Sequence, residues 1–383
     1  SFSGTQQLSD KLTAGITANY VRTNTKGRPQ TGYSNIASNF TQWWQRQLDM
    51  EELRDYKNPD GSQRSWNRNS EDDASPLYWD NPFWTLYENY ETDVRERMYG
   101  NFNLTYKVNE NLSVIATAMT DFYNDFRQER RAVGSVEAAY YSENRIRYSE
   151  NNYELKAVYR KRIGKNHDIS GFAGMNRLDR NTDQFFAKTN GGLNVPGFYS
   201  LDNSISPISI DPYKTRKRIN SMFAGLSYGY KGFLYLDATI RNDYSSALVG
   251  DNASYVYPSI SSSFVFTEIW KIPYMDFGKI RASYGKIGND TDPYRTEIRP
   301  SVGTSFDASG MFYMPNTLNN PNLRNESVYT WEVGAEMNFF MERVHLDVTY
   351  YNSTTKDNIF GVAQSAASGS TFRVINAGEM QNK

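Results

Sequence analysis

The chain is dominated by segments of about eleven residues in which polar and apolar side chains alternate. In segment 11–21 the even positions include Leu12, Ile16 and Tyr20, whereas most of the odd positions are polar. Segment 98–108 repeats this arrangement, with Phe102 and Leu104 on its apolar face. A period of two indicates β-strands whose two faces meet different surroundings.

Further segments of this kind lie at 112–123, 153–161, 222–231, 234–241, 280–286, 331–339 and 344–351. A strand of about eleven residues is roughly 36 Å long, and a tilt of about 40° reduces its height to about 28 Å. This height is close to that of the apolar band of an outer-membrane barrel, and strands in globular proteins are about half as long. The segment length therefore favours a transmembrane β-barrel.

The connections between these segments alternate between short and long. Short turns are predicted at 109–111, 164–166, 231–232 and 341–342, and long loops at 22–97, 124–150, 179–217 and 289–327. Short turns at one rim and long loops at the other are typical of an antiparallel barrel with periplasmic turns and extracellular loops. About 12 strands can be counted in this way.

Charged residues occur in the middle of several alternating segments. In a membrane barrel they must face the lumen, because a lipid-facing charge costs about 2 to 4 kcal/mol at the midplane. The predicted lumen-facing charges are Lys156, Arg160, Asp237, Arg281, Glu332, Glu336 and Asp347.

Soluble β-sandwiches and propellers also alternate, so they are the rival interpretation. The composition is polar, with a mean hydropathy of -0.71, yet 15% of residues are aromatic. Low hydropathy suits a lumen face with long loops, and aromatic residues near strand ends suit membrane girdles. The absence of cysteine excludes a disulfide framework and thiolate chemistry, and a net charge of -1 gives no basic excess for nucleic acid.

Several stretches resemble the SusC/RagA family of TonB-dependent outer-membrane transporters. The motif NPFW at 81–84, followed by DVRERMYGNFNLTYKV, is similar to the family's entry from a long loop into a strand. The hairpin 241–268 contains a similar Tyr-Pro-Ser segment, although its loop ALVGDN lacks the proline often found there. GKIRASYGKIGND from Gly278 and ESVYTWEVGAEMNFF from Glu326 match later strands.

The resemblance implies import of oligomeric nutrients, glycans or peptides, across the outer membrane of a Gram-negative bacterium. It also implies a SusD-like surface lipoprotein as a partner and energy from the TonB complex, relayed through a plug inside the barrel. The alternative function is that of a soluble, secreted, β-rich carbohydrate-binding protein.

The resemblance further predicts a fragment of one antiparallel barrel, with about 12 of an expected 22 strands and no plug domain. Residues 1–383 are predicted to form part of this transporter barrel, with 22–97 as a large extracellular loop. An open sheet of this kind leaves two unpaired edges, which lipid does not tolerate, so we expect it not to insert alone.

The long loop 22–97 holds five of the seven tryptophans. They form either an aromatic platform for substrate or the small core that a long ordered loop needs. The substrate-contact candidates are therefore Trp43, Trp44, Trp66, Trp79 and Trp84.

No catalytic residue, metal ligand or cofactor site is predicted, and the chain is not expected to be an enzyme. Walker A, GxSxG and zinc motifs are absent from the sequence. Asp60, Asp72 and Asp73 do not have calcium-loop spacing, so a solvated loop is favoured. The basic cluster of Lys214, Arg216, Lys217 and Arg218 is either a solvated strand end or a contact for lipopolysaccharide phosphates or an acidic substrate.

Overall fold

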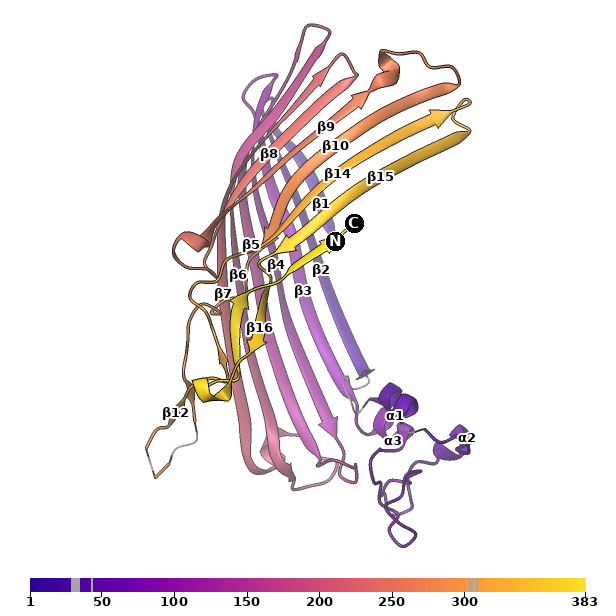
Figure 1. The fold of residues 1–383 in the computed structure, drawn as a ribbon. Coiled ribbons are helices and arrows are strands. Elements are labelled where there is room, and N and C mark those ends of the chain that lie inside the picture. Colours follow the sequence, from indigo (N-terminus) through magenta and orange to yellow (C-terminus); the bar gives the residue numbers. More distant parts are fainter. Residues whose placement is uncertain (29–34, 43, 304–305, 308) are drawn as a thin grey trace.

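The computed structural model describes residues 1–28, 35–42, 44–303, 306–307 and 309–383. One large antiparallel sheet curves as an open wall, with long hairpins at one end and short turns at the other (Figure 1). Within the described residues this sheet has 13 strands, and each is hydrogen-bonded to its neighbour in chain order. In spatial order they are β1 (Phe2–Ser9), β2 (Leu12–Arg28), β3 (Glu91–Lys107), β4 (Leu112–Arg131), β5 (Tyr140–Ile163), β6 (His167–Leu193), β7 (Ser204–Tyr230), β8 (Leu234–Ser245), β9 (Ser254–Val265), β10 (Met275–Asn289), β14 (Glu326–Phe339), β15 (Val344–Lys356) and β18 (Glu379–Asn382).

The remaining elements are short and lie in the connections. They are the helices α1 (Ile36–Gln42), α2 (Met50–Leu53) and α3 (Pro82–Tyr87), the 3-10 turns η1 (Leu201–Asn203), η2 (Gly250–Ala253), η3 (Phe266–Glu268) and η4 (Ala366–Ser368), and the small strands β11 (Ser301–Val302), β12 (Phe312–Tyr313), β13 (Thr317–Leu318), β16 (Ile359–Ala363) and β17 (Phe372–Asn376). Among the described residues, no helix is long and apolar enough to cross a membrane.

The register of the sheet separates an apolar face from a polar face. Ile16 of β2 pairs with Phe102 of β3, Phe102 with Ala118 of β4, and Ala118 with Tyr153 of β5, so one row of the sheet is apolar. Many of the side chains on this face are exposed, and Met222 is 69% exposed. Exposed apolar rows fit contact with lipid, so this is the outer face of the barrel wall.

The opposite, inner face carries the charges. By register, all seven mid-strand charges predicted to face the lumen lie on this face, which confirms that prediction. Arg281 of β10, for example, pairs across β14 with Asp347 of β15, and the Arg281 Nη2 to Asp347 Oδ1 distance is 2.7 Å. These ion pairs hold charge inside the wall and away from lipid.

The predicted short turns are present. Between β7 and β8, Lys231 and Gly232 both have positive φ, at 49° and 73°. The Phe233 N–H donates to the Tyr230 carbonyl at 3.1 Å, so Lys231 and Gly232 are the central residues of a tight turn within the three-residue connection 231–233. Positive φ at both central residues gives a twist that matches that of the flanking strands. Pro258 limits the pairing of β9 with β10. The ladder between these two strands ends at Ser259, and the next residue, Pro258, has no N–H to continue it.

The strands are longer than predicted, and two predicted loops are wrong. Most of 124–150 and 179–217 belongs to strands, because β4 runs to Arg131, β5 starts at Tyr140, and β6 and β7 each contain 27 residues. These extensions stand beyond the bilayer, where both faces meet water and alternation is no longer required. The loop predicted at 22–97 is correspondingly confined to the residues between Arg28 and Glu91.

The strand predicted from residue 371 onward is also split. β17 joins β13 and β16 in a separate three-stranded sheet, and only β18 pairs with β15. Beside this small sheet, an apolar cluster joins residues that follow β8, residues that precede β14, and β17. It contains Leu248, Ala253, Tyr255, Leu323 and Val374.

The strands β2 to β7 have 17 to 27 residues each, and we call this part of the sheet the tall wall. Its edge at β7 is only partly covered by a further strand. β7 pairs with β8 only from Ile219 onward, so its earlier residues have a strand partner on the β6 side alone. The backbone N–H groups of Arg216 and Arg218 point to the open side, where they donate to the hydroxyls of Tyr294 and Ser246. Pro212 has the same orientation in the strand as Arg216 and Arg218, but as a proline it has no N–H to donate on the open side.

The two faces should respond oppositely to a new charge. We expect Leu226→Lys, on the outer face of β7, to lower the free energy of unfolding by about 2 to 4 kcal/mol. Ser227→Lys on the inner face is the control, because Asp237 lies opposite Ser227 and can pair with the new lysine. Urea unfolding of the full protein in lipid vesicles measures both variants, and equal destabilisation would contradict the assignment of the faces.

Candidate functional site

The inner face of the tall wall carries a cluster of arginines, acids and tyrosines above the apolar rows. Asp125 of β4 is 3% exposed and is the most buried member. Its Oδ2 accepts hydrogen bonds from Arg95 Nε of β3 at 3.1 Å and from Arg127 Nη2 at 2.9 Å. One carboxylate therefore holds two guanidinium groups, each of which keeps further N–H donors.

Arg97 and Asp121 make a second pair beside the first. Arg97 Nε donates to Asp121 Oδ1 at 2.8 Å, and the Arg97 guanidinium lies 4.9 Å from the ring centroid of Tyr99. The Arg97 side chain is 45% exposed, so the pair faces the interior space rather than a packed core.

Two stacked tyrosines connect these pairs to the next strands. The rings of Tyr123 on β4 and Tyr148 on β5 have centroids 4.9 Å apart and planes inclined by 16°. The Arg95 guanidinium lies 4.9 Å from the Tyr123 centroid. On the other side, the Tyr148 hydroxyl donates to Glu150 Oε2 at 2.7 Å, and Arg180 Nε donates to the same oxygen at 2.8 Å.

We call this set the inner-wall cluster. Its members are Arg95, Arg97, Asp121, Tyr123, Asp125, Arg127, Tyr148, Glu150 and Arg180. They come from β3 to β6 and share one face because pairing alternates inward and outward positions along each strand. None was singled out from the sequence. Asp121 and Tyr123 lie at the end of the predicted strand 112–123, and the other seven members lie in segments that were predicted as loops.

The chemistry of the cluster is that of binding. It offers flat aromatic faces, guanidinium donors and carboxylate acceptors to a passing polar molecule. Within the part of the chain that the structure describes, no group of three or more His, Asp or Glu side chains is arranged to hold a metal ion.

A second unit, residues 35–42 and 44–90, lies at the end of the wall where β3 begins, and we call it the loop unit 35–90. Its centre is Asn81, which caps α3 and is fully buried. The Asn81 Oδ1 accepts from the Phe83 N–H at 2.8 Å, and Nδ2 donates to the carbonyls of Leu53 and Arg64 at 3.1 and 3.0 Å. The start of the NPFW motif thus ties three segments of the loop together.

Polar contacts anchor this unit to the β4–β5 connection. Asp80 Oδ1 accepts from the Val136 N–H at 2.8 Å, and Asn89 Oδ1 accepts from the Ala132 N–H at 2.8 Å. Trp84 Nε1 donates to the Ser135 hydroxyl at 2.8 Å. Burial raises the pKa of Asp80 above its usual range, although hydrogen bonds from Gln63 and Val136 act in the opposite direction.

Comparison with known proteins identifies the wall. The family model "TonB dependent receptor-like, beta-barrel" matches residues 44–383. The chain belongs to this TonB-dependent receptor family. Its members are outer-membrane proteins of Gram-negative bacteria, and this is the location of the present receptor chain. The soluble β-protein considered from the sequence is therefore wrong.

Individual relatives agree with this assignment. TonB-dependent receptor P26 of Formosa agariphila is 29% identical over 98% of this chain and 38% of its own length. The solved RagAB peptide transporter superposes with a TM-score of 0.79 at 17% identity, over 99% of this chain and 43% of its own. The siderophore receptor PiuA of Acinetobacter baumannii gives 0.52 at 13% identity, over 98% of this chain and 51% of its own. The receptor chain thus spans about two fifths of the length of P26 and RagAB.

The structure places the five tryptophan candidates differently from one another. Trp84 and Trp79 are buried, at 2% and 6% exposure, and pack inside the loop unit. Trp44 and Trp66 are partly exposed, with ring centroids 5.8 Å apart. Trp43 lies outside the described residues. Contact with substrate remains a prediction for all five, and the geometry favours Trp44 and Trp66.

The acidic run in the same loop forms turns. The Asp60 carboxylate accepts from the Ser62 N–H at 2.9 Å, and Asp73 accepts from the Ser75 N–H at 3.0 Å. Hydrogen bonds from Ser75 and Asn69 lower the pKa of Asp73 to about 2. These carboxylates are occupied by local turn hydrogen bonds.

Removing the Asn81 side chain should loosen the loop unit of the receptor chain. Asn81→Ala deletes the helix cap and leaves the carbonyls of Leu53 and Arg64 without their donor, which we expect to cost about 2 to 4 kcal/mol of local stability. Hydrogen exchange of residues 35–90 measures the effect, with Gln47→Ala, an exposed amide in the same unit, as control. Unchanged exchange in the Asn81 variant would contradict the anchoring role.

Asp80 should make the stability of the loop depend on pH. Because its folded pKa is raised, the carboxyl favours the folded loop below its ordinary pKa of about 4, and this contribution is lost as pH rises through the folded pKa. We expect the urea midpoint, followed by tryptophan fluorescence, to decrease from pH 4 to pH 7, and Asp80→Asn to flatten this slope. The same slope in both proteins would rule out Asp80 as its source.

Proposed function

We propose that this chain forms part of a transporter that imports oligomeric, hydrophilic nutrients across the outer membrane, without covalent chemistry. The observation that carries the proposal is the inner-wall cluster, which lines the lumen side of a TonB-dependent receptor wall. The reaction is passage of substrate, so the relevant chemistry is reversible binding.

The electrostatic balance of the cluster supports passage rather than retention. Arg95, Arg97, Arg127 and Arg180 each have a carboxylate partner in the described residues, so none presents an isolated charge. An arginine that already has a carboxylate partner attracts a second anion only weakly, because the partner offsets its charge. Many weak contacts allow an oligomer to be bound and then released along the wall.

The substrate class follows from the same chemistry. The stacked pair Tyr123 and Tyr148 offers an apolar, aromatic surface of the kind that packs against sugar rings or peptide side chains. Guanidinium donors suit the carboxylates and carbonyls of peptides as well as sugar hydroxyls. Glycans and peptides are therefore the two classes to test, and the peptide-transporter neighbour makes peptides the first choice.

Partners follow from the family and the layout. A SusD-like surface lipoprotein would deliver substrate at the extracellular end, where the loop unit 35–90 displays Trp44 and Trp66. The TonB complex would supply energy through a plug region. In this scheme the inner-wall cluster accepts the oligomer after delivery, and the tryptophans contact it first.

The test of the function is uptake by cells. A strain that lacks the gene should lose growth on, or uptake of, one class within panels of oligopeptides and oligosaccharides, and the gene restores it. Isothermal titration of the purified protein with the same panels identifies the bound class. Unchanged uptake of every panel member, together with no binding, would overturn the proposal.

Removing an inner tyrosine should weaken substrate binding specifically. We expect Tyr148→Ala to reduce affinity by about fivefold to tenfold, because one stacked ring is lost. Tyr159→Ala is the matched control, since Tyr159 lies on the outer face of the same strand. Equal affinity in the two variants would show that the cluster does not contact the substrate.

A further inference from the structure

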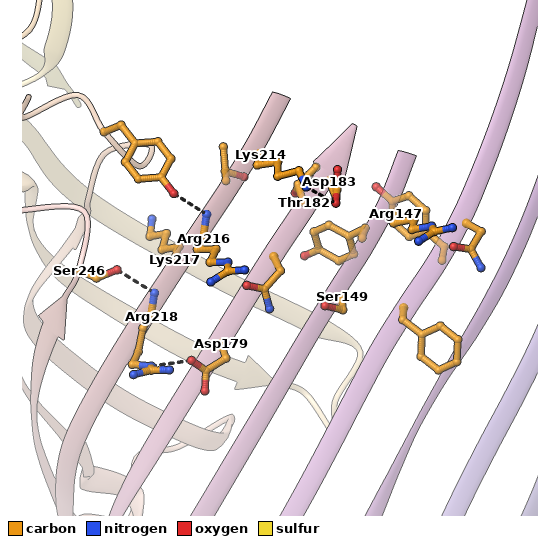
Figure 2. Close-up of a pocket in the computed structure, with 17 residues that line it drawn as sticks. Arg147, Ser149, Asp179, Thr182, Asp183, Lys214, Arg216, Lys217, Arg218 and Ser246 are labelled. Carbon is orange, nitrogen blue, oxygen red and sulfur yellow. Dashed lines mark hydrogen bonds and ion pairs between the residues drawn. The ribbon is translucent and has the colours of Figure 1, made fainter. Parts of the chain in front are cut away.

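The outer face of the tall wall carries a basic patch that import through the lumen does not use. It consists of Arg147 on β5 and of Lys214, Arg216 and Arg218 on β7. Figure 2 shows these side chains around a pocket of about 1000 Å³, with Ser149, Asp179 and Asp183 between them. By register, all four cations occupy outward positions, in line with Met222 and the other lipid-facing residues of the strands.

Lys217, which the sequence placed in the same basic cluster, does not belong to the patch. It occupies an inward position, and its side chain is 12% exposed. Lys217 Nζ pairs with Asp290 and donates to the carbonyl of Thr291 at 3.1 Å. The cluster seen in the sequence is thus divided between the two faces.

Two of the four cations in the patch are neutralised. Lys214 Nζ lies 3.1 Å from Asp183 Oδ2, and Arg218 Nε lies 2.6 Å from Asp179 Oδ1. Among the described residues, Arg147 and Arg216 make no ion pair. The patch therefore presents two guanidinium groups to an external anion, and guanidinium matches phosphate in bidentate geometry.

An apolar groove adjoins the patch on its membrane side. This groove has a volume of about 480 Å³, and its apolar lining includes Tyr153, Leu155, Met175, Met222 and Tyr244. Met222 is six residues from Arg216 along β7, which is about 20 Å of strand. Along about 20 Å of β7, the outer face therefore changes from an apolar groove to a basic patch. Lipid changes in the same order, from acyl chains to headgroups.

We propose that this face binds a phosphorylated, acylated lipid of the outer leaflet. The phosphate lies between Arg147 and Arg216, with the Ser149 hydroxyl and the Asn181 amide as further donors, and one acyl chain lies in the groove. Charge complementarity selects the phosphate, and the adjoining groove selects a lipid over an acidic protein. The inference rests on the outer-membrane location and is independent of what the lumen transports.

The test compares lipid retention by two double variants of the full protein extracted from outer membranes. Arg147→Gln with Arg216→Gln removes the unpaired cations and breaks no ion pair. Arg46→Gln with Arg68→Gln makes the same charge change at exposed positions of the loop unit. Native mass spectrometry then measures binding of three probes: a phosphorylated acyl lipid, the same lipid without phosphate, and inorganic phosphate.

We expect the wild type and the loop variant to retain the phosphorylated lipid, and the patch variant to bind it about thirtyfold more weakly. The lipid without phosphate should bind weakly to all three proteins, and inorganic phosphate should not displace the phosphorylated lipid. Equal lipid retention by the patch variant, equal binding of the lipid without phosphate, or displacement by inorganic phosphate would each overturn the proposal. Retention of an acidic protein in place of the lipid would overturn it as well.

Discussion

Backbone hydrogen bonding in a medium without water is the constraint on which the rest of this structure depends. Lipid offers no partner to an N–H or a carbonyl, so the membrane part of the chain must satisfy each group with a neighbouring strand. The continuous ladder does this for the strands from β2 to β14, each of which has a neighbouring strand on both sides. In such a ladder, successive side chains of each strand point in turn to lipid and to the lumen. The sequence therefore alternates between apolar and polar residues.

One consequence is that neighbouring residues serve different environments. On β5, Arg147 faces the outer patch, whereas Tyr148 stacks on Tyr123 inside the wall. On β7, Arg216 points outward, and Lys217 points inward to Asp290. A slip of one residue in register would exchange these roles along the whole strand, so the short hairpin turns also set the function of both faces.

These physical differences explain what could be predicted. Within the bilayer the two faces differ strongly, so the membrane part of the strands, the turn at Lys231 and the inward charges such as Arg281 could be read from alternation. Above the bilayer both faces are wet, and a strand such as 140–150 has no alternation to reveal it. The inner-wall cluster depends on those extensions and on register between separate hairpins, which no local pattern contains. The buried Trp84 likewise finds its hydrogen-bond partner, Ser135, in a different loop.

The open edge of β7 has a consequence for receptors that stand close together. The residues of β7 that precede Ile219 have no strand partner on the β8 side, and an edge of this kind can pair with another chain. Pro212 interrupts the row of donors, and the charged side chains of Lys214 and Arg216 flank the next positions. If two such edges approached each other in a crowded membrane, Pro212 would offer no N–H for a shared ladder, and the basic side chains of the two edges would repel one another. The hairpin of β6 and β7 can therefore extend from the wall without joining neighbouring barrels into a continuous sheet.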